Sequence, residues 1–215
     1  MFTKYAVHKI YLVVCAVIIL HATFLTAMVD GMFMPERLRY YTIISNFMLG
    51  IGFLIMALLK ETSALRANIS LAVLTSITIT GLVYNLILVP FGDATAIFVG
   101  YTNFVTHLLS MLLALANYFI FEEKGYIKLN NIPAGLAPGV LYWIVFVAIG
   151  DTIDFRPYFF MNSEEIGWIM VFVWFIVIVV FMSIITVGII MYDRIKGKPR
   201  QYVRNHTPNP YEDVL

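Results

Sequence analysis

Six long runs of apolar residues alternate with short polar segments along the chain. The runs cover residues 10–29, 40–59, 68–89, 101–121, 132–149 and 168–191. Each comes close to or exceeds the roughly 20 residues that a membrane-spanning helix needs. Charged and turn-forming residues fill the segments between them. The pattern predicts an all-α integral membrane protein, a six-transmembrane-helix bundle that forms a single domain over residues 1–215, with a polar tail at residues 194–215.

The composition supports a protein that lies almost entirely within the bilayer. Of the 215 residues, 61% are hydrophobic and 13% are charged, and the mean hydropathy is +0.87. A soluble domain is about half apolar and a quarter charged. The net charge is only +1, so no overall positive field attracts nucleic acid. No glycine-rich phosphate loop appears, and we expect no cofactor.

The basic residues between the predicted spans indicate the orientation in the membrane. An even number of spans places both termini on one side. That side carries eleven of the 14 basic residues: Lys4, Lys9, Lys60, Arg66, Lys124, Lys128, Arg194, Lys196, Lys198, Arg200 and Arg204. Arg37, Arg39 and Arg156 lie on the other side. Because cytoplasmic loops are enriched in Lys and Arg, we predict that both termini are cytoplasmic.

Polar side chains from four spans lie at a similar depth in this topology, near the outer surface. Span 4 carries Asn103 and His107, which share a helix face at i and i+4, with His107 about 10 Å deep at 1.5 Å per residue. Thr42 and Asn46 share a face of span 2 in the same way. His21 of span 1 and Asn85 of span 3 complete the set. We predict that these six side chains form one cavity.

Most of these residues also have structural explanations. Thr in a membrane helix often bonds its own backbone, and intramembrane Asn often joins helices, which covers Thr42, Asn46, Asn85 and Asn103. His21 fits a hydrogen-bonded packing residue. His107 favours a functional role, because Asn103 accompanies it and no carboxylate lies nearby to form an ion pair.

The types of polar residue limit the chemistry. Two histidines without Cys or an in-span carboxylate fall short of a usual metal site, so we predict no metal. Ion-coupled transport is disfavoured because no Asp or Glu lies mid-span. A hydroxyl and an imidazole remain, and they are the minimum for nucleophilic catalysis. Arg37 and Arg39 precede Thr42 and are candidates to attract an anionic substrate at the cavity mouth, or to act as interfacial anchors.

Three short motifs resemble those of a known family. Thr42-Ile-Ile-Ser-Asn46 at the start of span 2, Asn103-x-x-x-His107 in span 4 and Pro157-Tyr-Phe-Phe-Met-Asn162 before span 6 resemble the Pr6Pr and FAR-17a/AIG1-like membrane proteins. The resemblance extends over nearly the whole chain in span number and motif order. Animal members are threonine hydrolases of fatty acid esters of hydroxy fatty acids. The resemblance implies that Thr42 is a nucleophile and His107 its base.

The sequence also departs from that family. Members often carry Pro five residues after the histidine, then an acidic residue and Trp, where this chain has Leu112, Asn117 and Tyr118. We therefore interpret the chain as a distant member. Its short loops and short termini suggest a bacterial cell-membrane protein with several spans.

Two functions remain open at this stage. The first is a hydrolase of lipid or fatty-acid esters, in which Asn46, Asn103, His21 or Asn85 stabilises the oxyanion or orients His107. The second is a non-catalytic binder, sensor or transporter of a lipid or small molecule that uses the same pocket. Both imply contact with membrane lipids. The oligomeric state, the substrate and the third catalytic member cannot be inferred from the sequence.

Overall fold

Six long helical segments make up the protein in a computed structural model, which describes residues 3–92, 94–96, 98–150 and 152–197. Each segment is long and apolar enough to cross a membrane. They are α1 (Lys4–Thr26); α2 (Tyr41–Leu58); α3 (Ala64–Val83) with the π-helical turn η2 (Tyr84–Leu88); α4 (Tyr101–Phe104), η3 (Val105–Leu109), α5 (Ser110–Ala116) and η4 (Asn117–Phe121) in one continuous segment; η5 (Leu129–Asn131) with α6 (Ile132–Ile149); and α7 (Ser163–Lys196). The predicted six-helix architecture is confirmed.

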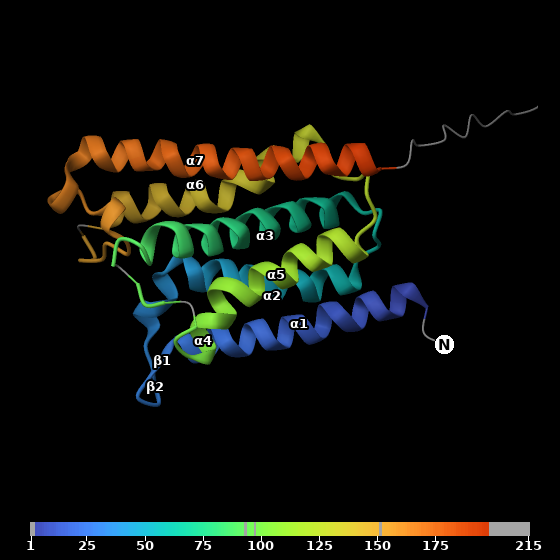
Figure 1. The fold of residues 1–215 in the computed structure, drawn as a ribbon, viewed down its shortest axis with the longest axis horizontal. Coiled ribbons are helices and arrows are strands. Elements are labelled where there is room, and N and C mark those ends of the chain that lie inside the picture. Colours follow the sequence, from blue (N-terminus) through green and yellow to red (C-terminus); the bar gives the residue numbers. More distant parts are fainter. Residues whose placement is uncertain (1–2, 93, 97, 151, 198–215) are drawn as a thin grey trace, which may run out of the picture.

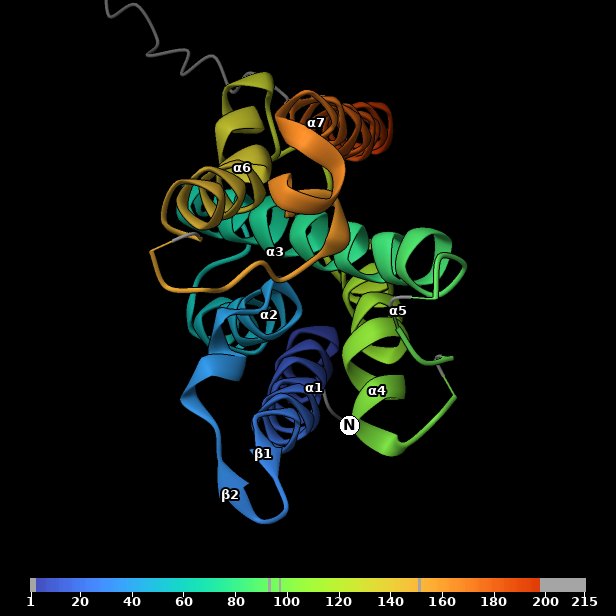
Figure 2. The same cartoon turned by 90° about the vertical axis from the view of Figure 1, so that its left-hand side faces the viewer.

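The segments lie side by side, and α3 is central (Figures 1 and 2). It packs against α2, α5, α6 and α7, while α1 packs mainly against α2. The start of α1 and the end of α7 lie at the same end of the bundle (Figure 1), as an even number of spans requires. We call this the terminal end and the opposite end the hairpin end. Which of them faces the cytoplasm stays a prediction.

Helix boundaries differ from the apolar runs where polar residues cap or extend a helix. The Thr3 side chain accepts a hydrogen bond from the Ala6 amide, so α1 begins before its apolar run. Asn162 caps α7 in the same way through the Glu164 amide. Gly167 then interrupts the helix with a φ of 76°. Of the predicted polar tail, residues 194–196 end α7, and residues 198–215 lie outside the described residues.

A short hairpin marks the end opposite the termini. Strands β1 (Met28–Val29) and β2 (Met32–Phe33) pair antiparallel. Asp30 and Gly31 connect them with φ values of 48° and 79°, which is the geometry that an Asp-Gly hairpin turn favours. The 3₁₀ turn η1 (Pro35–Arg39) then leads into α2, and a second one, η6 (Phe159–Met161), precedes α7.

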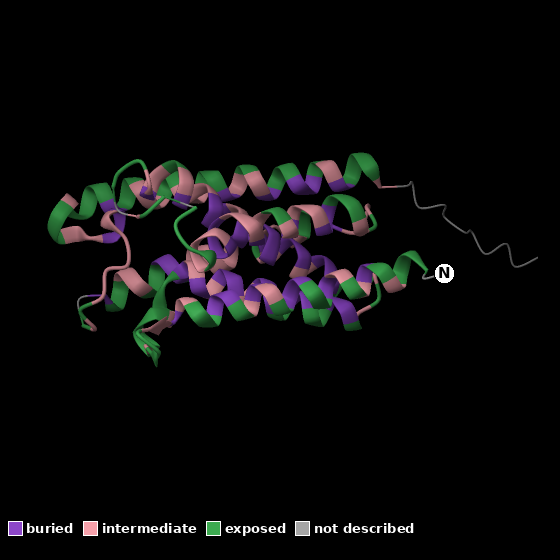
Figure 3. Cartoon of the chain, turned by 60° about the horizontal axis from the view of Figure 1, so that its bottom comes forward, coloured by how far each residue is buried: buried purple, intermediate pink, exposed green. Residues whose placement is uncertain are grey.

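Burial follows from the central position of α3. Buried residues lie on the inward faces of the helices, whereas the outward faces of the peripheral helices are exposed (Figure 3). The exposed residues of α7 include Phe172, Ile176 and Ile184. Such an apolar exterior is what a lipid environment requires, because it would be costly in water.

A hydrogen-bonded network of ionisable side chains joins the helices at the terminal end, and the hydropathy pattern did not reveal it. The ring nitrogens of His8 lie 3.0 Å from the Glu61 carboxylate and 2.9 Å from the Asn117 amide oxygen. The Asn117 amide donates to Glu122 at 2.6 Å, and the Ser70 hydroxyl donates to the same carboxylate at 2.7 Å. The network thus links α1 and α3 to the end of the fourth span.

At the terminal end, Asp193 of α7 also binds the loop that follows the fourth span. Its carboxylate accepts hydrogen bonds from the backbone amides of Gly125 and Ile127, at 2.8 and 2.9 Å, and from the Tyr118 hydroxyl. Arg66, near the start of α3 at the same end of the bundle, donates to the backbone oxygen of Met56. Because buried charges are costly without partners, these bonds explain how α3 and α7 carry charges inside the bundle.

Candidate functional site

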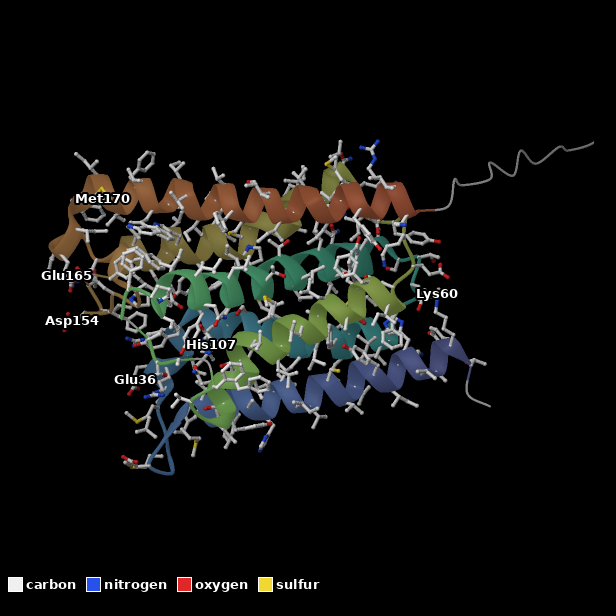
Figure 4. The ribbon with its side chains drawn as sticks, in the orientation of Figure 1. Glu36, Lys60, His107, Asp154, Glu165 and Met170 are labelled. Atoms are coloured by element: carbon white, nitrogen blue, oxygen red, sulfur yellow. The ribbon has the colours of Figure 1, made fainter. Side chains whose placement is uncertain are left out.

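A cavity of about 620 Å³ opens at the hairpin end, a size typical of ligand sites. Thr42 from α2 and His107 from the fourth span both line it. The other lining residues come from the end of α1, the hairpin, η1, η2 and the loop before α7: Thr26, Val29, Met34, Glu36, Arg37, Tyr40, Ile43, Tyr84, Leu88, Ala94, Phe155, Pro157 and Tyr158. Figure 4 shows His107 in the half of the bundle that carries Glu36, Asp154 and Glu165, away from Lys60.

The hydrogen bonds of His107 define the role of each ring nitrogen. Its Nδ1 lies 3.1 Å from the backbone oxygen of Asn103. A carbonyl oxygen only accepts, so this contact places the ring proton on Nδ1. No described residue bonds to Nε2. In this tautomer Nε2 carries the lone pair, which is the state that a general base requires.

The backbone around His107 departs from a regular α-helix. Val105–Leu109 form a π-helical turn, closed by a hydrogen bond from the Ser110 amide to the Val105 oxygen. Tyr84 begins another such turn in the neighbouring segment, and its ring stacks on the His107 ring with a centroid distance of 3.5 Å. Single π-turns are rare and occur frequently at functional sites. Two of them meet here.

Thr42 lies at the second position of α2, where the helix begins at the cavity. Its hydroxyl lies within hydrogen-bonding reach of the Tyr158 side chain, which enters from the loop before α7. Burial raises the pKa of Tyr158 to about 12, and the Thr42 contact opposes the rise. Tyr158 therefore stays protonated at neutral pH. The sequence motif around Pro157 included Tyr158 but assigned it no role.

Three of the predicted orienting residues bond to backbone atoms. Asn46 donates to the carbonyl oxygens of Thr42 and Thr106, at 2.8 and 2.9 Å. Asn85 donates to the oxygens of Gly81 and His107, at 2.7 and 3.4 Å. Asn103 donates to Ala96 at 3.0 Å, and its amide oxygen lies 2.7 Å from the Tyr84 hydroxyl. These side chains hold the helices around the site, and none of the three lines the cavity.

The remaining predicted residues lie in different places. His21 is exposed on α1, its nearest described ring is Tyr101 at 6.2 Å, and it does not line the cavity. The prediction that all six polar side chains share one cavity is therefore too broad. Arg37 lines the cavity and donates to the Thr26 oxygen at 3.2 Å. Arg39 lies outside it, over the Phe155 ring.

A smaller apolar pocket of about 50 Å³ adjoins the cavity. The two share Thr42, Tyr84, Leu88 and Tyr158. The further lining comes mainly from apolar and aromatic side chains of α3, α6 and α7, among them Ile79, Trp143 and Met182. The nucleophile candidate thus lies between an open cavity that contains polar side chains and an apolar pocket, which suits an amphipathic ligand.

No group of three or more His, Cys, Asp or Glu residues is placed to hold a metal ion within the described part of the chain. The polar side-chain groups that line the cavity are hydroxyl, imidazole, phenol and guanidinium groups and the carboxylate of Glu36.

Comparison of the chain with models of protein families, with characterised proteins and with solved structures finds no match. Membership of the Pr6Pr and FAR-17a/AIG1-like family stays a prediction from the short motifs. A fold alone does not define a function, so the residues of the site indicate it.

Proposed function

We propose that the protein is an intramembrane hydrolase of lipid or fatty-acid esters, with Thr42 as nucleophile and His107 as general base. One observation carries the proposal. Two residues from separate spans line the same cavity, and the Asn103 contact places the imidazole proton on Nδ1, while Nε2 has no partner among the described residues. A threonine hydroxyl is a weak nucleophile unless a base accepts its proton, and we assign this role to His107, whose imidazole lines the same cavity.

The reaction takes place in two halves. The Thr42 oxygen attacks the ester carbonyl carbon while its proton passes to Nε2 of His107. The tetrahedral intermediate then collapses, the ester C–O bond breaks, and His107 returns the proton to the departing alcohol. Water next attacks the acyl-threonine with the same base, and the carboxylic acid leaves as Thr42 recovers its proton. The Asn103 carbonyl orients the imidazole in the place that a carboxylate takes in other triads.

The surroundings favour a lipid substrate. The six spans leave little mass outside the bilayer, and the pocket beside Thr42 is apolar. An acyl chain fits that environment, while the ester reaches the polar cavity. If the basic residues mark the cytoplasmic side, the substrate enters from the outer leaflet of the cell membrane. Resemblance to the threonine hydrolases of fatty acid esters of hydroxy fatty acids leads to the same assignment.

The test is ester hydrolysis by the purified protein in detergent, with fluorophosphonate labelling as a second measurement. Thr42→Ala, His107→Ala and the double variant should all show nearly the same residual rate, lower by at least about 10²-fold, because residues that act as a unit lose activity non-additively. Thr42→Ala should also abolish labelling.

Matched controls exist in the chain. Thr23 is buried on α1 with its hydroxyl bonded to the Ile19 oxygen, and His21 is exposed. Thr23→Ala and His21→Ala should keep normal activity. Turnover in Thr42→Ala equal to that of the wild type would refute the hydrolase. Ligand binding without any turnover by the wild type would favour the non-catalytic lipid binder.

A further inference from the structure

The loop before α7 places a phenol directly beside the proposed nucleophile. The Tyr158 ring packs against Phe160 at a centroid distance of 5.1 Å and against Tyr40 at 6.3 Å. Phe160 in turn stacks on Trp143 of α6 at 5.5 Å. These contacts hold the ring between the loop, α2 and α6, so the hydroxyl has a defined position at the border of the two pockets.

The hydrogen-bond partners of the phenol determine where its proton can go. The first backbone amides of α2, those of Tyr41 and Thr42, have no acceptor within the helix and lie within reach of the Tyr158 oxygen. The next two amides, of Ile43 and Ile44, bond to Tyr40 instead. Amide groups only donate. The Tyr158 oxygen therefore accepts from the backbone. Its own hydrogen can donate to the Thr42 side-chain oxygen or to the Tyr142 hydroxyl, which itself donates to the Arg39 oxygen.

The side-chain donors of Asn46, Asn85 and Tyr84 are already engaged. Asn46 and Asn85 each direct both amide hydrogens at carbonyl oxygens. The Tyr84 hydroxyl lies 2.7 Å from both the Thr95 oxygen and the Asn103 amide oxygen. The oxyanion of the tetrahedral intermediate forms two bonds away from the Thr42 oxygen and would need a donor aimed at that point. The phenol of Tyr158 meets this need.

We propose that Tyr158 is a further catalytic residue, which donates its phenol hydrogen bond to the oxyanion formed when Thr42 attacks the ester carbonyl. This inference rests on the proposed hydrolase function. As the Thr42 oxygen bonds to the carbonyl carbon, the electron pair of the C=O bond moves to the carbonyl oxygen. The Tyr158 hydrogen bond shifts from the threonine oxygen to that anion. The phenol keeps its proton throughout, while the threonine proton goes to His107.

The protonation state of Tyr158 fits this role. Its pKa of about 12 keeps the hydroxyl protonated over the whole range in which the enzyme would work. Amide donation to the phenol oxygen polarises the O–H bond and strengthens it as a donor.

Tyr158→Phe tests the inference, because it keeps the ring and removes only the hydroxyl. With a short-chain p-nitrophenyl ester as probe, kcat should fall about 10²- to 10³-fold with KM nearly unchanged, as for loss of an oxyanion donor. Fluorophosphonate labelling should become slower yet still reach one label per protein, because Thr42 remains. Tyr11→Phe is the matched control. It removes a phenol that bonds to the Leu113 oxygen at 2.7 Å, away from the cavity, and should leave kcat unchanged.

The outcomes separate this inference from the hydrolase itself. An active wild type with inactive Thr42→Ala, but with Tyr158→Phe as fast as Tyr11→Phe, would overturn the role of Tyr158 and leave the hydrolase standing. A higher KM at constant kcat in Tyr158→Phe would also overturn it, because the hydroxyl would then only bind substrate. No turnover by the wild type would refute the hydrolase first.

Discussion

Replacing Glu122 by Gln should remove a pH-dependent part of the stability. Burial raises the pKa of the Glu122 carboxyl, while the Ser70 hydrogen bond and the charges of Arg66, Lys124 and His8 oppose the rise. The free carboxyl in an unfolded chain has a pKa of about 4.3. As the pH rises above that value, the unfolded protein releases this proton before the folded protein does. The stability from Glu122 is therefore present at acid pH and is lost as the pH rises through its folded pKa.

The size of the effect follows from the pKa difference. A difference of one pH unit corresponds to about 1.4 kcal/mol, which shifts the Tm of a chain of this size by about 3–6 °C. Gln cannot ionise, so Glu122→Gln lacks this loss. The Gln side chain also has one acceptor oxygen where the carboxylate has two. One of the donors to this side chain therefore loses its acceptor, which lowers Tm by a constant amount. The Tm of Glu122→Gln minus the Tm of the wild type should therefore increase as the pH rises from about 4.3, and then level off.

Thermal unfolding in detergent between pH 4 and pH 8 measures this difference. Glu123→Gln is the control, because Glu123 is the neighbouring residue and is exposed. Its Tm difference from the wild type should not vary with pH. If the Tm of Glu122→Gln minus the Tm of the wild type stays constant or decreases as the pH rises, the reasoning is refuted.

Two further changes test the cavity. Gly81→Val should slow fluorophosphonate labelling at least tenfold, because a Cβ there would lie 3.0 Å from the His107 oxygen and 2.7 Å from the Met111 sulfur, and overpacking of this kind shifts the backbone. Gly188→Ala, where the added Cβ meets nothing within 4 Å, should leave labelling unchanged. Arg37→Gln should weaken binding of anionic lipid esters about two- to fivefold and spare neutral ones, in a paired KM measurement. Arg39→Gln should spare both, and an equal loss for neutral and anionic esters in Arg37→Gln would indicate an interfacial anchor.

The six helices could be predicted because their apolar length is set by the thickness of the bilayer. The ends of the helices could not, because capping by Thr3 and Asn162 acts beyond the apolar runs. The hairpin did have a local signal in Asp30-Gly31, which we interpreted only as a loop. The network at the terminal end was missed because Asp193 and Arg66 each fall at the margin of an apolar run, where hydropathy does not reveal whether a charge has partners.

Only part of the candidate site could be predicted from the sequence. Sequence position gives the depth of a residue in the membrane, and Thr42 and His107 do line one cavity. Depth does not give the direction in which a side chain points around its helix. His21 has a suitable depth and faces outward. The π-turn at Val105–Leu109 adds a residue to one turn, which changes the helix face presented after it, and no sequence period predicts this.

The hydrogen-bond pattern separates the polar side chains that hold the helices together from those that line the cavity. Polar groups in hydrocarbon need partners, and at the hairpin end the amide hydrogens of Asn46 and Asn85 bond to backbone carbonyls beside the π-turns. This removes them from the cavity and fixes the backbone on both sides of His107. Thr42, His107 and Tyr158 by contrast line the cavity, where the proposed reaction would use them. The side-chain amides of Asn46 and Asn85 therefore have a structural role that differs from the role proposed for the Thr42 hydroxyl. Replacing Asn46 or Asn85 should alter the position of His107 without removing a reacting group.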